Sequence, residues 1–308
     1  MPDSSIVWKK STLVDMISIF ACPKPFTNPH IATIQRNAIT SWTLLQPRPE
    51  IIIFGEEEGT SDICNELGLR HSPEMARNEH GTPLLNNIFQ MASRMATHQH
   101  VCFINADIVL MEDFMSAVRT VSVWRQQFLM VGRRWDVGIT QPLEFRDPQW
   151  RENLKTTVQD CGKQQLPTWI DYFVFPKGLY QNLPAFAIGR PFYDNWLIWQ
   201  TARLKAPIVD ASASVMAVHQ NHDYSHVPGG EMAASRVKEG QNNSRLAGGW
   251  RHCYTIEDAT YRLTPSGIRR NLSLRYFQRR GEMARRWLVD WNRPLRRSLG
   301  IGRKRAGS

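Results

Sequence analysis

The chain has 308 residues, of which 42% are hydrophobic, and it carries a formal net charge of +10. Its apolar stretches all fall short of the roughly 18 residues that a membrane-spanning helix needs, and its first residues lack the layout of a signal peptide. The five cysteines are scattered without Cys-x-x-Cys spacing, which argues against a disulfide framework or a zinc site and predicts a cytoplasmic protein.

The positive charge is concentrated at the end of the chain. Residues 269–308 contain 12 arginines and one lysine against two acidic residues, so this segment accounts for all of the excess. Residues 1–268 are close to neutral. The pattern indicates a globular domain with a basic appendage, and it does not indicate a specific nucleic-acid-binding core.

The first part of the chain predicts strands that alternate with helices. Residues 16–22 form a short apolar run before a proline-rich turn, which predicts a strand. Residues 29–45 have apolar side chains at helical spacing and are followed by two prolines, which predicts a helix. A second strand is expected over 50–55, followed by an acidic turn and a short helix through 61–68.

The same alternation continues into the middle of the chain. A helix over 81–96 is predicted to begin with Thr82 as N-cap and Pro83 at its first position. A strand, a helix and another strand are then expected over 101–110, 112–124 and 128–135. This alternation is typical of an α/β domain of Rossmann-like form, with a mostly parallel central sheet covered by helices on both faces.

The second half of the chain is less regular. Residues 146–167 are polar and predict a helix with a loop, and a strand is expected over 168–180. Pro191 opens a predicted helix over 189–206, which has Asp194 in its first turn. Two short strands are then expected within 207–226, where they lead into a loop with three histidines.

Asp107 follows a strand that reads as buried, and ligands of parallel α/β sheets bind beyond the carboxyl ends of the strands. A buried carboxylate is costly unless it is paired or bound to a metal. Asp107 is therefore a candidate ligand for Mn²⁺ or Mg²⁺, which would bridge substrate phosphates. The alternative is that Asp107 caps the next helix or hydrogen-bonds to the turn.

The loop after residue 217 offers His219, His222 and His226. A neutral imidazole at a strand end can complete a metal site, so we predict that His219, or next His222, joins Asp107 across the sheet. Exposed or core-edge histidines are the simpler explanation. A zinc site built from all three is disfavoured, because their spacing does not place them on one helical face and no cysteine accompanies them.

Asp194 stands among aromatic residues in the first turn of its predicted helix. The helix N-terminus would stabilise its anion, and a carboxylate held there could act as a general base. Simple helix capping is the alternative and would be worth on the order of 1 kcal/mol. In the acidic turn, Glu56 could contact a ribose or a base edge, or it could be solvated.

Three short motifs, taken in order, resemble those of the GT-A fold glycosyltransferases, the nucleotide-diphospho-sugar transferase superfamily, and are similar to its family 2. "INAD" at 104–107 resembles the Asp-x-Asp motif of these enzymes, with Asn105 in place of the first acid. "YDNW" at 193–196 resembles the helix-start acid of inverting members, and "AVHQNH" at 217–222 resembles their metal-binding histidine.

This resemblance implies a transferase that moves a sugar from a nucleotide-diphosphate donor, with a UDP-sugar as the expected donor, to an acceptor hydroxyl with inversion. Asp194 would be the catalytic base, and Mn²⁺ or Mg²⁺ would be held by Asp107 with His219 or His222. The donor-binding residues it implies are Cys22, Pro23, Lys24, Glu56, Asn105 and Ala106. The implied acceptor, a saccharide or a lipid-linked sugar, would contact Asp171, Tyr172 and Trp196.

The resemblance also implies a domain organisation. A catalytic domain over 14–265 would have a nucleotide-sugar-binding half, 14–135, and an acceptor half, 136–265. A basic tail rich in arginine and tryptophan would follow over 266–308. Segments of this composition can lie on anionic membranes, which would make the protein peripheral to the membrane. The alternative is that the tail packs its apolar face on the domain.

Two other functions stay open. A sugar-phosphate nucleotidyltransferase of the same fold usually has a glycine-rich loop after its first strand, and here that loop has Lys24 but no glycine. A non-catalytic sugar-binding or membrane-binding protein that has lost its metal would be consistent with Asn105. The chain also lacks the Asp-Asp-Gly-Ser type of turn after the second strand, which leaves the donor sugar open.

Overall fold

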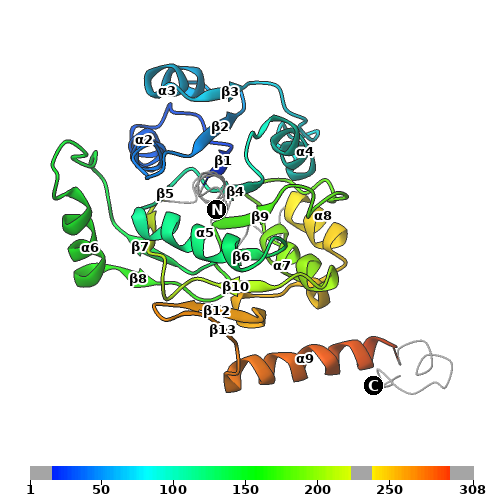
Figure 1. The fold of residues 1–308 in the computed structure, drawn as a ribbon. Helices are drawn as coiled ribbons and strands as arrows, with labels where there is room; N and C mark the ends of the chain where they lie inside the picture. Colours follow the sequence, from blue (N-terminus) through cyan, green and yellow to red (C-terminus); the bar gives the residue numbers. More distant parts are fainter. Residues whose placement is uncertain (1–15, 223–237, 292–308) are drawn as a thin grey trace, which may run out of the picture.

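The computed structural model describes residues 16–222 and 238–291, and within them helices pack on both faces of a large sheet (Figure 1). The first four elements alternate as predicted: β1 (Ile17–Ala21), α2 (Pro29–Thr43), β2 (Glu50–Phe54) and α3 (Thr60–Leu67). The short strand β3 (Arg70–Ser72), which the sequence did not predict, follows them. The helix α2 begins with Asn28 as N-cap, whose side chain accepts hydrogen bonds from the amides of His30 and Ile31.

The middle of the chain passes between two sheets. Its elements are α4 (Leu85–Met95), β4 (His100–Ile104), β5 (Ile108–Val109), α5 (Glu112–Trp124), β6 (Leu129–Val131) and β7 (Arg134–Val137). The second half adds α6 (Trp150–Cys161), β8 (Lys163–Gln164), β9 (Tyr172–Pro176), α7 (Tyr193–Arg203), β10 (Ile208–Asp210) and β11 (Ala217–Gln220). After the gap come α8 (Lys238–Ala247), the 3₁₀ turns η2 (Trp250–His252) and η3 (Ile256–Asp258), β12 (Tyr261–Thr264), β13 (Gly267–Arg270) and α9 (Leu274–Trp291).

The large sheet has nine strands in the order β13-β12-β10-β6-β9-β4-β1-β2-β3. Most neighbours are parallel, while β9 runs antiparallel between β4 and β6, and β13 antiparallel to β12. The predicted α/β class with a mostly parallel sheet is therefore confirmed. One buried cluster joins the sheet to α2, α3 and α5, and a second joins its other face to α4, α7 and α8 (Figure 1).

Two strands that the sequence predicts as continuous are each divided between two sheets. The run 101–110 breaks into β4 and β5, and the run 128–135 breaks into β6 and β7. The second strand of each pair enters a small sheet with the order β5-β11-β7-β8. Asn105, Ala106 and Asp107 form the connection from β4 to β5, so the chain changes sheets where the predicted metal ligand lies.

The helix α4 begins later than Thr82 and Pro83 predict. It starts at Leu85, and its N-cap Leu84 makes no side-chain capping bond. The reason is that the preceding backbone is engaged in isolated bridges, of Pro83 with Arg77 and of Leu84 with Ala187. Thr82 and Pro83 thereby become part of a cavity wall.

The basic tail begins inside the sheet. The predicted boundary at residue 265 falls within the hairpin of β12 and β13, and β12 pairs in parallel with β10. Beyond the hairpin, α9 is attached to the body where Arg279 donates to Asp258 at 2.8 Å. No helix among residues 16–222 and 238–291 is both long and apolar enough to cross a membrane.

Candidate active site

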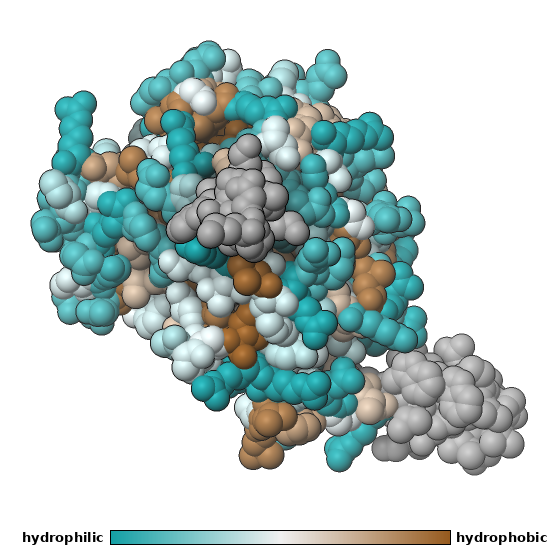
Figure 2. Space-filling view, viewed as in Figure 1, coloured by the Kyte–Doolittle hydropathy of each residue, from teal (hydrophilic) through white to brown (hydrophobic). Residues whose placement is uncertain are grey.

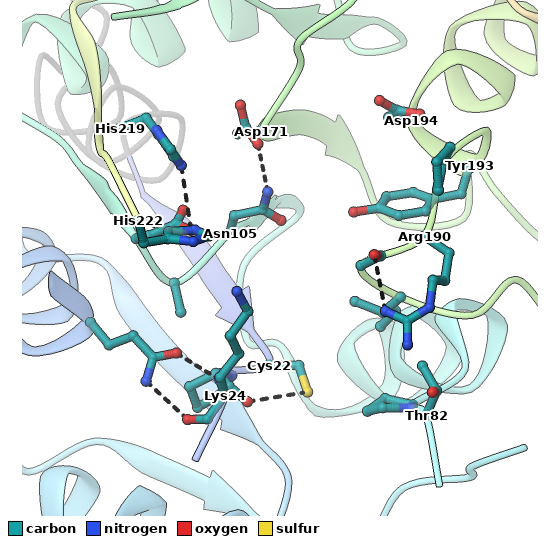
Figure 3. Close-up of a pocket in the computed structure, with 18 of the residues that line it drawn as sticks. Cys22, Lys24, Thr82, Asn105, Asp171, Arg190, Tyr193, Asp194, His219 and His222 are labelled. Atoms are coloured by element: carbon teal, nitrogen blue, oxygen red, sulfur yellow. Dashed lines mark hydrogen bonds and ion pairs between the residues drawn. The ribbon is translucent and has the colours of Figure 1, made fainter. Parts of the chain in front are cut away.

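A cavity of about 770 Å³ opens where the ends of β1 and β4 meet the start of α7 (Figure 3). Its lining brings together residues from distant parts of the chain. Those that the sequence predicted are Cys22, Pro23, Lys24, Asn105, Ala106, Asp107, Asp171, Asp194, His219 and His222.

Asp107, His219 and His222 form a three-residue cluster on one wall of this cavity. One ligand atom from each lies within 4.8 Å of the others. Asp107 Oδ2 is 3.1 Å from Nε2 of His222 and 3.7 Å from Nε2 of His219, while Asp107 Oδ1 is buried and makes no hydrogen bond with the residues that the structure describes. An orphaned carboxylate oxygen beside two imidazoles fits a divalent cation. The mixed donor set suits Mn²⁺ better than Mg²⁺, which prefers oxygen ligands alone.

The small sheet explains why these residues meet. His219 on β11 lies opposite Ile108 of β5 in the antiparallel pair and opposite Asp136 of β7 in the parallel pair. Asp107 immediately precedes β5, so the pairing of β5 with β11 brings its carboxylate beside His219. Since alternate residues of a strand share a face, Arg134 and Asp136 both point to the same side of β7.

Asp136 holds the other side of the His219 ring. His219 Nδ1 lies 3.2 Å from Asp136 Oδ1, and the two Asp136 oxygens also accept from Arg134 Nε and Gln165 Nε2, each at 2.7 Å. A carboxylate behind a histidine fixes the orientation of the ring and leaves Nε2 as the ligand atom. The geometry thus directs Nε2 of His219 toward Asp107.

Arg134 connects His219 and Asp136 to Asp171, another acid that lines the cavity. Its Nη1 donates to Asp171 Oδ2 at 3.0 Å, and its guanidinium lies 4.6 Å from the centre of the Trp169 ring. Asp171 in turn accepts from Asn105 Nδ2 at 2.6 Å (Figure 3). The residue at the position of the first acid in the Asp-x-Asp motif therefore orients Asp171 through its amide.

The environment of Asp107 favours its anion. Burial works against ionisation, but the neighbouring His219 and His222 outweigh it, with a further contribution from Lys24, and hold the pKa of Asp107 well below its usual range. A carboxylate that stays ionised at all ordinary pH values is available as a metal ligand without first losing a proton.

Asp194 has the opposite environment at the start of α7. Burial is the main cause that raises its pKa to about 7, and the Asp171 carboxylate adds to the rise. Its Oδ1 is buried and accepts no hydrogen bond from the described residues. Phe192, two residues earlier at the N-cap of α7, has a φ of 91°, a left-handed conformation that is rare for a bulky side chain. A carboxylate with a pKa near neutrality and an unpaired oxygen can accept a proton at physiological pH.

The loop after β1 forms the floor of the cavity. The Gln35 side chain binds the Lys24 backbone twice, accepting from its N–H at 2.6 Å and donating to its carbonyl at 2.9 Å. Figure 3 shows the Lys24 side chain extending into the cavity. Burial raises the pKa of the Cys22 thiol to about 12, so this cysteine is protonated and offers no thiolate.

Three predicted contact residues lie outside the cavity lining. Glu56 is exposed, and its neighbour Glu57 lines the cavity instead, in an ion pair of 2.7 Å with Arg77. Tyr172 and Trp196 are buried in the two cores on opposite faces of the large sheet, because their positions on β9 and α7 turn them inward. The structure therefore corrects the prediction that Tyr172 and Trp196 contact the acceptor. His226 lies outside the described residues.

Several functional candidates were not anticipated from the sequence: Arg134, Asp136, Trp169 and Arg190. The alternation in "RRWDV" does place Arg134 and Asp136 on one face of a strand, but only the pairing of β7 with β11 shows that this face meets His219. Arg190 lies on the opposite wall, where its Nη2 is 2.8 Å from Glu239 Oε2 of α8.

No family model matches the chain, and no curated protein matches it in sequence. Among solved structures it is similar to glucosyl-3-phosphoglycerate synthase from Mycobacterium tuberculosis with Mn²⁺, uridine diphosphate and phosphoglyceric acid. That match has 15% identity and a TM-score of 0.48, and it covers 81% of this chain and 85% of that chain.

Two further structures are similar at the same level. TarS from S. aureus with UDP-GlcNAc has 12% identity and a TM-score of 0.49, covering 75% of this chain and 65% of that chain. The mannosyltransferase PcManGT from Pyrobaculum calidifontis with GDP-Man and Mn²⁺ has 14% identity and a TM-score of 0.38, covering 66% and 56%. At these identities and scores, the likeness assigns no donor, acceptor or site residue to this chain.

Proposed function

We propose that this chain is a metal-assisted glycosyltransferase of the GT-A type, which transfers a sugar from a nucleotide-diphosphate donor to an acceptor hydroxyl. One observation carries the proposal: a single cavity holds a three-residue metal-ligand cluster on one wall and a carboxylate with a pKa of about 7 on another. The two features match the two needs of the reaction, which are a stabilised diphosphate leaving group and a base for the acceptor.

In this proposal the donor lies across the ends of β1 and β4. Asp107, His219 and His222 would hold Mn²⁺, which supplies Lewis-acid stabilisation of the diphosphate when it is bound. Lys24 extends from the loop after β1 toward the same region and would add a positive charge near the phosphates. The resemblance in the sequence favours UDP as the nucleotide.

On the other wall, Asp194 would take the proton of the acceptor hydroxyl. The freed oxygen would attack the anomeric carbon from the face opposite the diphosphate, forming the new C–O bond as the bond from that carbon to the diphosphate breaks. The electron pair of the broken bond would leave with the nucleoside diphosphate, and the sugar configuration would be inverted. Asp171, held by Asn105 and Arg134, would contact the sugar or the acceptor.

The acceptor in this proposal is a saccharide or a lipid-linked sugar, and the reaction takes place in the cytoplasm. All five cysteines lie within the described residues and are free thiols, which agrees with a reducing compartment. The reading as a protein that has lost its metal is disfavoured, because the cluster has three ligands without Asn105.

The test measures nucleoside diphosphate release from UDP-, GDP- and other nucleotide sugars, with Mn²⁺, with Mg²⁺ and with a chelator. We expect metal-dependent release with one donor class and a loss of release in Asp194→Asn. Metal-dependent binding of a nucleotide sugar without release would favour a binding protein. Formation of a nucleotide sugar from a nucleoside triphosphate and a sugar phosphate would favour a nucleotidyltransferase.

A further inference from the structure

The helix α9 has two faces of different character. Arg279 and Met283, four residues apart, are buried against the body. Leu274 is nine residues from Met283, about two and a half helical turns, and so lies on the opposite side of the helix. Its exposed fraction is 74%, and nearby Leu272 and Phe277 are 72% and 55% exposed.

Figure 2 shows hydrophobic atoms at the lower edge of the molecule, over the start of α9, next to a band of hydrophilic ones. We call the three exposed residues Leu272, Leu274 and Phe277 the α9 patch. The helix α9 extends from β13 past the rest of the body (Figure 1). The α9 patch therefore faces outward.

Among the residues with described side chains, the charges around the α9 patch are positive and lack free acidic partners. The acids that α9 approaches are already paired: Asp258 and Glu282 with Arg279, and Glu257 with Arg275. The remaining arginines near the patch are exposed and make no ion pair with the residues that the structure describes: Arg269, Arg270, Arg280 and Arg285.

We propose that the α9 patch and its flanking arginines form a docking surface for an anionic lipid membrane, with Leu272, Leu274 and Phe277 entering the headgroup boundary. Aliphatic and aromatic side chains on one face of a helix, with arginines beside them, are the composition of helices that lie in a membrane interface. Anionic headgroups would pair with these arginines. Each basic residue near the membrane surface increases the binding affinity by about fivefold.

Two other occupants fit the surface less well. A second copy of the chain would bring the same four arginines against themselves across a twofold axis, and the acids that α9 approaches among the described residues are already paired. A nucleic acid would engage the arginines through its phosphates but would leave the apolar side chains exposed to water. If the proposed transferase function also holds, docking would keep the cavity near lipid-linked acceptors.

The experiment is flotation of the full chain with vesicles of neutral phosphatidylcholine and with vesicles that contain about a third phosphatidylglycerol, at low and high salt. We expect binding to the anionic vesicles alone, weakened by salt. Leu274→Ser with Phe277→Ser should reduce binding at least about tenfold, and Arg280→Gln with Arg285→Gln about 25-fold. All four side chains are exposed, so melting temperatures should stay unchanged.

Matched variants separate the patch from general composition. Val123→Ser with Leu166→Ser removes equally exposed apolar residues elsewhere, and Arg94→Gln with Arg146→Gln removes two exposed charges elsewhere. Neither control should change flotation.

The proposal is overturned if the controls lose binding as much as the patch variants, or if the protein does not bind anionic vesicles. It is also overturned if the patch instead mediates dimerisation measured by light scattering, or binding of duplex DNA. Nucleoside diphosphate release from a soluble acceptor should be equal in all these variants, so loss of docking and loss of transfer are read separately.

Discussion

Two carboxylates in the same cavity, Asp107 and Asp194, have pKa values displaced in opposite directions. Burial disfavours the anion of both. At Asp107 the adjacent His219 and His222 reverse that effect and keep the carboxylate ionised. At Asp194 burial raises the pKa to about 7, and the Asp171 carboxylate adds to that effect.

The difference shows that neighbours, and not depth of burial, decide what each acid can do. An acid beside two imidazoles is a permanent anion and suits a cation. An acid among aromatic side chains and another carboxylate holds a proton near neutral pH and suits proton transfer. Pairs of titratable groups whose pKa values are pushed apart in this way are a common basis for dividing roles within one active site.

Of the substitutions at the two acids, removal of the Asp107 carboxylate should cause the largest loss of metal binding and of transfer. In Asp107→Asn we expect Mn²⁺ binding, followed by calorimetry, to become undetectable, and transfer to fall by about 1,000-fold or more because the leaving group loses its stabilisation. Asp62→Asn, at an exposed acid on α3, should leave both unchanged. Full Mn²⁺ affinity in Asp107→Asn would place the metal elsewhere.

Changing Asp194 to Asn should lower kcat by about 100- to 10,000-fold, the range expected when a general base is lost. Mn²⁺ affinity should remain that of the wild type, because Asp194 is not in the ligand cluster. This split between turnover and metal binding distinguishes the two acids. Equal losses of both in Asp194→Asn would mean that the start of α7 is simply misfolded, which circular dichroism would reveal.

Removing Asp136 tests whether the carboxylate behind His219 positions the ring. We expect Asp136→Ala to weaken Mn²⁺ binding by about 10- to 100-fold, the usual effect of losing such a partner. Asp136→Asn keeps an oxygen acceptor for His219 Nδ1 and should recover much of the affinity. If Asp136→Ala and Asp136→Asn both bind Mn²⁺ as tightly as the wild type, the orientation of the His219 ring does not depend on Asp136.

The raised pKa of Asp194 predicts a pH dependence of activity. A base must be unprotonated, so kcat should rise as pH increases through about 7 and then level off. The profile is measured by nucleoside diphosphate release at saturating substrate and metal. A limb whose midpoint lies below pH 5 would show that Asp194 is not the group that controls turnover.

The same shift predicts a smaller effect on stability, with a definite sign. The pKa of Asp194 is raised in the folded state from an ordinary 3.8 to about 7, so the folded protein holds this proton more tightly. The resulting stability is complete below pH 4 and is lost as pH rises through 7. Between pH 5 and pH 8, metal-free wild type should lose about 5 °C in Tm relative to Asp194→Asn. Identical pH dependence in the two proteins would contradict the shift.

The amino-acid sequence by itself determined the α/β class and the main candidates for the two acids. Apolar strand-like runs alternate with helical periodicity, and these local patterns need no knowledge of partners. Asp107 stands out because it interrupts a buried run, and Asp194 because Pro191 marks a helix start just before it. His219 and His222 could be suggested as partners only from the order of the motifs.

The tertiary structure alone decided how these residues are used. The break of the predicted strand at 101–110 comes from pairing of β5 with β11, a contact between residues more than a hundred positions apart. The equally non-local pairing of β7 with β11 places Asp136 behind His219. Asn105, in the connection from β4 to β5, donates its amide to Asp171. Strand periodicity gives each side chain one of two faces, but which sheet a face meets depends on register with distant strands. For that reason Tyr172 and Trp196, plausible as contacts in the sequence, lie in the cores, whereas Arg134 lines the cavity and Asp136 lies directly behind His219.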